Sequence, residues 1–323
     1  MEPTTAATTA QRVVYIAGLG RSGSTLLERL LGELPGVCAV GEVVHMWRRS
    51  IVDDERCGCG EPFAGCGFWR GVGEAAFGGW AAVDVGRVAQ LRAAVDRNRF
   101  APLLAGPALP PRFRRALDEY VCYYQRVYAA VSAVSGCATI VDSSKHPSLA
   151  FCLRWAPGLD LRVVHVVRDS RAVAHSWTKQ VARPDAPAES YMRTFSPVAS
   201  ATQWNVQNAA LHLLARVGTP TMRIRYEDLA CAPAATLRRI AAFAGLPADE
   251  PALRFLGQDA DGPWADLAPA HTTSGNRMRF YTGRISIRAD EAWRSAMPIA
   301  QRTTVSALTL ALLTRYGYFR ARA

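Results

Sequence analysis

A glycine-rich stretch at residues 18–27, Gly-Leu-Gly-Arg-Ser-Gly-Ser-Thr-Leu-Leu, constrains the fold more than any other part of this chain. Residues 13–17 before it are apolar and partly β-branched, which predicts a buried strand. Residues 26–31 after it have the pattern of the first turns of a helix. Glycines permit a tight turn and close approach of the backbone, and the free N–H groups at a helix start attract an anion. The stretch is therefore predicted to be a phosphate-binding loop.

The positive charge of this loop is in an unusual place. Gly18 and Gly23 have the spacing of a nucleotide P-loop, but Ser24 stands where a P-loop has its lysine, and Thr25 follows. The cation of the loop is Arg21 instead. A kinase needs the lysine, and usually a hydroxyl and an aspartate that hold Mg²⁺. Arg21 with neighbouring hydroxyls favours an anion site that works without a metal.

Strand and helix patterns alternate along the rest of the chain. The apolar patterns predict strands at 37–42, 138–142, 161–167 and 220–225, and helices at 203–216, 234–244 and 251–256. This alternation indicates an α/β fold, with a P-loop-like central parallel sheet flanked by helices. Residues 1–11 are predicted to be a disordered lead-in, and residues 12–323 a single domain.

Residues 43–130 interrupt the alternation and predict a mostly helical insertion, with helices at 83–100 and 111–131. The insertion is rich in large aromatic residues. They form either a wall of an acceptor pocket or the insertion's own small core. Residues 181–197 are rich in Pro, Ala and Ser and are predicted to be a mobile loop or lid.

Functional groups of a parallel sheet belong at the carboxyl ends of its strands. Five candidates lie at or just past the ends of predicted strands, namely Arg21, Glu42, Lys145, Arg168 and Tyr226. A guanidinium at a strand end with a hydroxyl in the next helix, as in Arg168 and Ser176, suits a second phosphate. Two phosphate sites imply a nucleotide that is phosphorylated at two positions.

The chain is basic, with a formal charge of +11, which suits an anionic ligand. The charge is mostly dispersed arginine, without a Lys/Arg run, a helix-turn-helix pattern or zinc-finger spacing, so no nucleic-acid partner is expected. No segment has about 20 uninterrupted apolar residues, so no membrane span is expected. Residues 1–11 lack the features of a secretory signal. The protein is expected to be soluble and cytoplasmic.

Three of the eight cysteines cluster as Cys57, Cys59 and Cys66. These three thiols could hold a metal if the nearby His45 were the fourth ligand, although the sequence does not identify that ligand. Cys-x-Cys is not typical zinc spacing. A loop held by packing or by a disulfide is the favoured interpretation, and no metal is expected.

Four stretches resemble the sulfotransferases that use 3′-phosphoadenosine 5′-phosphosulfate (PAPS). Residues 20–27 resemble the loop of that family for the 5′-phosphosulfate, and residues 166–176 its segment for the 3′-phosphate. Residues 225–229 are similar to its strand beside the adenine. Residues 274–288 resemble its late Gly- and Arg-bearing loop, which closes on the 3′-phosphate. The subgroup resembled is the bacterial, tyrosylprotein- and carbohydrate-sulfotransferase-like one. The resemblance extends from residue 13 to about 293, apart from the insertion.

The resemblance implies in-line transfer of a sulfuryl group to an acceptor hydroxyl, with 3′-phosphoadenosine 5′-phosphate (PAP) as product. It implies Glu42 as the general base, with His45 as its rival, while Lys145 and Arg21 stabilise the leaving group. The implied donor-binding residues are Gly20, Arg21, Ser22, Gly23, Ser24, Thr25, Leu26, Arg168, Ser176, Tyr226, Ser274, Gly275, Asn276, Arg279 and Arg288. Trp204 is a further candidate for adenine contact, with helix packing as the alternative.

The acceptor is expected to be a small molecule such as a secondary metabolite, phenol, sugar or lipid-linked hydroxyl compound. The sequence identifies neither the acceptor nor the oligomeric state. The alternative function is a P-loop kinase-like phosphotransferase.

Overall fold

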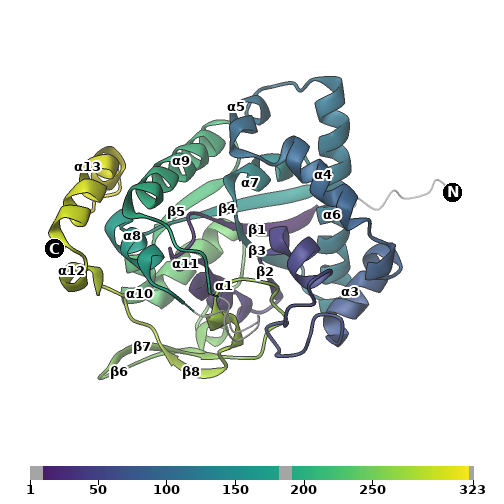
Figure 1. The fold of residues 1–323 in the computed structure, drawn as a ribbon. Coiled ribbons are helices and arrows are strands. Elements are labelled where there is room, and N and C mark those ends of the chain that lie inside the picture. Colours follow the sequence, from purple (N-terminus) through teal and green to yellow (C-terminus); the bar gives the residue numbers. More distant parts are fainter. Residues whose placement is uncertain (1–9, 182–190, 320–323) are drawn as a thin grey trace.

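The computed structural model of the chain describes residues 10–181 and 191–319 (Figure 1). Its centre is a parallel sheet of five strands in the order β2-β3-β1-β4-β5. These strands are β1 (Gln11–Ala17), β2 (Val37–Gly41), β3 (Thr139–Lys145), β4 (Leu159–Val167) and β5 (Thr221–Arg225). The predicted fold class, a parallel sheet flanked by helices, is confirmed.

Both faces of the sheet are buried, and β1 shows why the strand pattern is continuous rather than alternating. Val13 and Tyr15 point into one apolar cluster, whereas Val14 and Ile16 point into the other. The first cluster includes residues of α6 (Pro111–Ser135), α7 (Pro147–Leu153) and α9 (Pro197–Arg216). The second includes residues of α1 (Ser24–Gly32), α10 (Tyr226–Cys231) and α11 (Pro233–Ala244).

Three further helices pack at the β5 side of the molecule, where Figure 1 shows α13 beside α9. They are α8 (Ser170–Thr178), α12 (Trp293–Ala296) and α13 (Ile299–Arg315). Within residues 10–181 and 191–319, no helix combines the length and the apolar character needed to cross a membrane.

The insertion is mostly helical, as predicted. Before α6 it contains α2 (Val43–His45), a π-helical turn (Met46–Ser50), α3 (Gly67–Phe77), α4 (Val85–Val95), α5 (Ala101–Leu104) and two 3₁₀ turns (Trp80–Ala82 and Asn98–Phe100). Most of its aromatics form its own core, because Trp69, Tyr120, Tyr124 and Tyr128 are fully buried. Their polar atoms have partners; the Tyr120 hydroxyl, for example, donates to Asp96 over 2.8 Å.

The structure corrects three predicted boundaries. Gln11 belongs to β1 and not to a disordered lead-in, because its backbone pairs with β4. β3 extends three residues beyond the predicted strand, to Lys145. The predicted helix at 251–256 is only a 3₁₀ turn (Pro251–Leu253).

A second sheet, antiparallel, follows that turn and was not predicted. Its strands are β6 (Leu256–Asp259), β7 (Gly262–Leu267) and β8 (Gly283–Ser286). The segment between β7 and β8 returns to the edge of the main sheet, where the backbones of Thr273 and Gly41 form a parallel bridge. This return brings residues near 275 beside the carboxyl end of β2.

Candidate active site

The predicted phosphate loop connects β1 to α1 through two residues in the left-handed region of backbone conformation. Arg21 has φ of 72° and Gly23 has φ of 86°. Gly23 is the N-cap of α1, and no described side chain caps that helix end. The first amide groups of α1 are therefore available to an anion, and the helix dipole favours negative charge there.

Close packing requires all three glycines of the loop, and a Cβ on Gly18 would lie 2.4 Å from the Val166 backbone oxygen. A Cβ atom on Gly20 would lie 2.8 Å from the ring of Trp177 on α8, and one on Gly23 would overlap the ring of Tyr226. The loop is thus pressed between α8 and the start of α10. Its hydroxyl residues Ser22 and Ser24 are buried in the same place.

Arg21 lies across α8 at the mouth of the loop. Its guanidinium is 5.2 Å from the ring centroid of Trp177, and it contacts Met192 Sδ at 3.4 Å. Burial and the neighbouring Arg168 lower the pKa of Arg21, but an arginine side chain remains charged. Residues 182–190 of the predicted lid lie outside the described residues.

Arg168 is fixed from several directions. Its guanidinium donates to the backbone oxygen of Arg21 over 2.9 Å, and it pairs with the carboxylate of Asp290 at 3.3 Å. It also lies 4.6 Å from the ring centroid of Tyr226. The indole N–H of Trp204 donates to the Arg168 backbone oxygen over 3.1 Å. The Arg168 guanidinium therefore lies against the backbone of the phosphate loop at Arg21, an arrangement that suits an anion.

Trp204 is only 1% exposed, so in this arrangement it packs and positions Arg168 rather than offering a face to adenine. The ring of Tyr226 is likewise enclosed between Gly23 and Arg168, and its hydroxyl donates to the Arg288 backbone oxygen over 3.1 Å. The side chain of Arg288 is exposed, and Ser176 is half-buried on α8. The roles of these residues in donor binding stay predictions.

Glu42, Lys145 and His45 meet at the carboxyl ends of β2 and β3. Lys145, the last residue of β3, forms an ion pair with Glu42, and His45 Nε2 lies 3.6 Å from the same carboxylate. The backbone oxygen of Lys145 accepts from the Gly18 N–H over 3.2 Å, which connects this group to the phosphate loop. Both predicted candidates for the base thus lie beside the predicted leaving-group stabiliser.

The electrostatics favour Glu42 over His45 as an ionised group. Burial, the largest single influence, would raise the pKa of Glu42, but Lys145 together with His45 and Arg49 outweighs burial and holds that pKa below its ordinary value. Burial lowers the pKa of His45 to about 3, so this imidazole is neutral at neutral pH. At neutral pH the group therefore contains a carboxylate with an ammonium partner and a neutral histidine.

The late loop lies beside Glu42. The N–H of Glu42 donates to the Thr273 backbone oxygen over 2.8 Å, and a Cβ on Gly275 would lie 3.0 Å from Glu42 Oε1. Ser274 has φ of 52°, and the side chain of Asn276 accepts from the Met278 N–H. The structure places this part of the loop near the candidate base, whereas the resemblance implied contact with the 3′-phosphate.

Arg279 has a structural contact that the sequence did not suggest. It is 1% exposed, and its guanidinium donates to the backbone oxygen of Arg56 in the insertion over 2.9 Å. In this arrangement it ties the late loop to the insertion. Its predicted contact with a phosphate stays untested.

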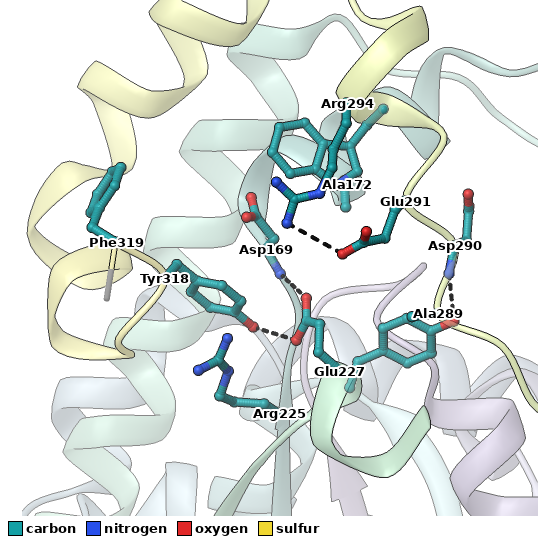
Figure 2. Close-up of a pocket in the computed structure, with 12 residues that line it drawn as sticks. Asp169, Ala172, Arg225, Glu227, Ala289, Asp290, Glu291, Arg294, Tyr318 and Phe319 are labelled. Atoms are coloured by element: carbon teal, nitrogen blue, oxygen red, sulfur yellow. Dashed lines mark hydrogen bonds and ion pairs between the residues drawn. The ribbon is translucent and has the colours of Figure 1, made fainter. Parts of the chain in front are cut away.

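A cavity of about 450 Å³ is lined by Tyr226 and by the residues labelled in Figure 2. Glu227 is fixed in its wall, because its carboxylate accepts from the Asp169 N–H over 3.0 Å and from the Tyr318 hydroxyl over 2.9 Å. Asp290 lines the same cavity and also pairs with Arg168. The cavity therefore adjoins the arginine-bearing site and is large enough for a small ligand.

Sequence reasoning missed three residues at these sites. Trp177 and Asp290 contact the two predicted arginines, but nothing in the local sequence distinguishes them. The sequence suggested His45 as a possible fourth ligand beside the clustered cysteines. The histidine that lies beside them is His271 instead.

Sequence comparisons with known proteins find similarity to sulfotransferases. Residues 110–250 match the sequence model of the sulfotransferase family. The chain is 30% identical over 178 residues to carbohydrate sulfotransferase 5 of Mus musculus, an alignment covering 50% of this chain and 42% of that protein. It is 28% identical over 177 residues to carbohydrate sulfotransferase 6 of Homo sapiens, with the same coverage. The chain thus spans less than half the length of these curated relatives.

Among solved structures, the sulfotransferase domain of the Synechococcus PCC 7002 olefin synthase aligns with a TM-score of 0.46 and 20% identity. That alignment covers 94% of this chain and 95% of the other.

Proposed function

We propose that the chain is a sulfotransferase, like the family whose sequence model matches residues 110–250, and that it transfers a sulfuryl group from PAPS to an acceptor hydroxyl. One observation carries this proposal: the guanidinium of Arg168 donates to the backbone oxygen of Arg21 in the phosphate loop. That loop has no lysine at the P-loop position. Arg21 in the loop and Arg168 after β4 provide two guanidinium groups, which suits a donor with two phosphate-bearing ends.

In the proposed reaction, Arg21 and the amide groups at the start of α1 bind the 5′-phosphosulfate. Such preorganised donors are each worth about 3 to 4 kcal/mol of transition-state stabilisation. Arg168 and Ser176 bind the 3′-phosphate, with Arg288 and Asn276 as further candidates. A 3′-phosphate would compete with Asp290 for Arg168, since the two form an ion pair.

The ion pair of Glu42 and Lys145 provides both a base and a leaving-group stabiliser. The acceptor oxygen attacks sulfur, the bond from sulfur to the bridging oxygen breaks, and PAP leaves with the electron pair of that bond. Glu42 takes the proton of the acceptor hydroxyl, and Lys145 neutralises charge on the bridging oxygen. When Lys145 turns to the donor, Glu42 loses its partner and becomes more basic, as a general base requires.

The first experiment is calorimetry with PAP and with Mg²⁺-ATP. We expect PAP to bind without a metal and far more tightly than Mg²⁺-ATP, because ATP lacks the 3′-phosphate. Tighter binding of Mg²⁺-ATP would overturn the proposal and favour a kinase-like phosphotransferase. Salt-sensitive binding of duplex DNA without nucleotide preference would indicate a non-catalytic nucleic-acid-binding protein.

The acceptor is proposed to be a small molecule that carries a hydroxyl group. Two of the relatives are named for carbohydrates, which makes sugars the first class to test. The measurement is transfer of label from ³⁵S-labelled PAPS to panels of sugars, phenols and lipid-linked alcohols. Labelling confined to one class identifies the acceptor class, and the PAP-binding result distinguishes a wrong acceptor from a wrong donor.

A further inference from the structure

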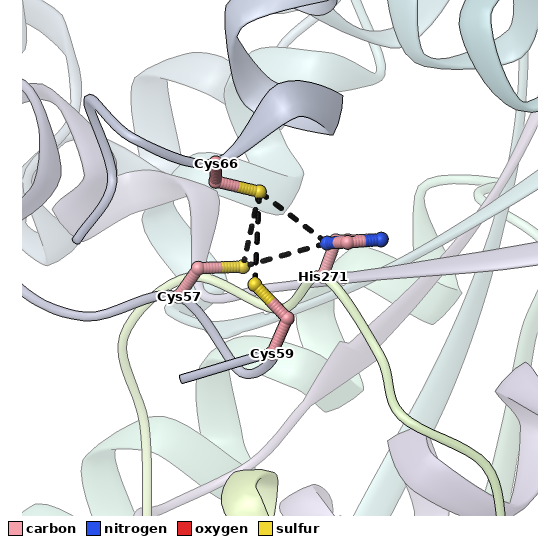
Figure 3. Close-up of side chains that lie close together, drawn as sticks. All are labelled: Cys57, Cys59, Cys66 and His271. Carbon is pink, nitrogen blue, oxygen red and sulfur yellow. Dashed lines mark hydrogen bonds between the residues drawn. The ribbon is translucent and has the colours of Figure 1, made fainter. Parts of the chain in front are cut away.

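Cys57, Cys59, Cys66 and His271 gather at one point between the insertion and the late loop (Figure 3). Their four ligand atoms, three Sγ and one imidazole nitrogen, all lie within 4.8 Å of one another. We infer that these four residues form a structural metal site for Zn²⁺, and this inference does not depend on the proposed transfer reaction.

Four of the six separations between the ligand atoms fit the edges of a tetrahedron around one ion, and the other two are within 4.8 Å. Zn²⁺ with Zn–S of about 2.3 Å and Zn–N of about 2.0 Å requires sulfur–sulfur edges of about 3.8 Å and sulfur–nitrogen edges of about 3.5 Å. Cys66 Sγ lies 3.7 Å from Cys57 Sγ and 3.8 Å from Cys59 Sγ. His271 Nδ1 lies 3.3 Å from Cys66 Sγ and 3.8 Å from Cys57 Sγ.

The ligand types indicate which metal is bound and what it does. Three thiolates and one imidazole form a soft donor set that selects Zn²⁺ over Mg²⁺ or Ca²⁺. Four protein ligands complete the tetrahedral coordination and leave no position for a substrate or water, which is typical of a structural site. Cys59 supplies a ligand two residues after Cys57, and the fourth ligand lies 205 residues after Cys66. That separation explains why the local spacing did not reveal the site.

The surrounding residues fix the ligands in this geometry. The ring of Phe68 stacks on His271 at 4.8 Å, and the indole N–H of Trp69 donates to the His271 backbone oxygen over 2.9 Å. The N–H of Gly58 donates to the Thr272 backbone oxygen over 2.9 Å. A Cβ on Gly58 would lie 2.6 Å from Thr272 Oγ1, so only glycine permits this approach. Partners of this kind orient metal ligands and are part of such sites.

The proposed ion would fasten the insertion to the segment that positions Glu42. His271 is two residues before Thr273, whose backbone pairs with Val40 and with the N–H of Glu42. Without the ion, the attachment depends on Arg279 and on the hydrogen bonds described above. Zn²⁺ would therefore stabilise the edge of the active site without touching the reactants.

The test begins with the metal content of the full chain, purified without chelator and then equilibrated with Zn²⁺. We expect about one Zn²⁺ per chain, bound by deprotonated thiols. X-ray absorption at the zinc edge should show three sulfur ligands and one nitrogen ligand. A chain that binds no Zn²⁺ while all eight thiols remain titratable would overturn the proposal, and so would a disulfide among the three cysteines.

Matched variants locate the ion. Cys66→Ser and His271→Ala should bring the Zn²⁺ content near zero, whereas His271→Cys restores a fourth ligand and should retain the ion. Cys122→Ser, at an exposed position on α6, is the control and should keep full content. Full content in both Cys66→Ser and His271→Ala would place the ion elsewhere. If the variants do not fold, chelation of the wild-type chain should still lower its Tm, and re-addition of Zn²⁺ should restore it; an unchanged Tm would contradict the proposal.

Discussion

Glu42 is the residue on which the proposed chemistry depends most directly. Glu42→Gln keeps the side-chain volume and removes the proton acceptor, so kcat should fall by about 10² to 10⁴-fold. The Kd for PAP, measured by calorimetry, should stay unchanged because the side chain at this position would not touch the donor phosphates. His45→Ala is the companion variant. Full turnover in Glu42→Gln combined with lost turnover in His45→Ala would assign the base to His45.

Lys145 sets the pH dependence of that base. Its charge holds the pKa of Glu42 below its ordinary value, so the acid limb of kcat/KM should lie below that value in the wild type. In Lys145→Met, burial acts without its main opposing charge, and the limb should move to higher pH by about 1 to 3 units. The chain has only one other lysine, and Lys179→Met, at the exposed end of α8, should leave the limb in place. An unmoved limb in Lys145→Met would show that another group is titrating.

At the scale of elements, the loop between β1 and α1 depends on contact between Gly23 and Tyr226. Gly23→Ala places a methyl group in the Tyr226 ring and should displace the Arg168 side chain stacked on it. Calorimetry should show PAP binding at least about tenfold weaker, which is about 1.4 kcal/mol. Gly36→Ala is the matched control, because Gly36 has φ of 73° but no atom of the described residues lies within 4 Å of the added Cβ. It carries the backbone cost of about 1 to 2 kcal/mol alone, so it should lower Tm and leave PAP binding intact.

Elements with strong local patterns could be predicted from the sequence, and those built from distant contacts could not. The five parallel strands and the helical insertion follow from apolar runs of adequate length, and Glu42 and Lys145 follow because parallel strands end at one edge. The antiparallel sheet was missed because β6 and β8 have only four residues each and carry little apolar pattern. A turn signal, Asp261-Gly262, was the one local indication of the hairpin between β6 and β7.

At the scale of the whole molecule, residues 268–290 contact elements that lie far from them in the sequence. Arg29 on α1 donates to the Ala268 backbone oxygen over 2.6 Å, and Thr273 pairs with the end of β2. Asp290 pairs with Arg168, and His271 lies among the cysteines of the insertion. Each contact spans more than 100 residues, so no local pattern could predict it. The α/β class could therefore be predicted from the sequence, but the long-range contacts that enclose the candidate active site could not.

A buried carboxyl between α1 and β3 should make the stability of the whole molecule depend on pH. Glu28 on α1 is 2% exposed, and its carboxyl accepts from Ser143 of β3 over 2.7 Å. Burial raises its pKa from 4.5 to about 7. A raised carboxyl pKa gives stability that is fully present below the unfolded value, near 4.5, and is lost as pH rises through about 7. The free energy of unfolding should therefore lose about 3 kcal/mol across that window from this group alone.

Glu28→Gln removes this titration and keeps an acceptor for Ser143. Denaturant titrations should show that the variant gains stability relative to the wild type between pH 5 and pH 8. The reason is that only the wild type has a buried carboxyl that tends to ionise at pH 8. Glu119→Gln is the control, since Glu119 is exposed on α6 and paired with Arg87, which holds its pKa below the ordinary value. Its difference from wild type should be the same at both pH values. An equally constant difference for Glu28→Gln would mean that the carboxyl titrates alike in the folded and unfolded chains, and that burial between α1 and β3 does not control its charge.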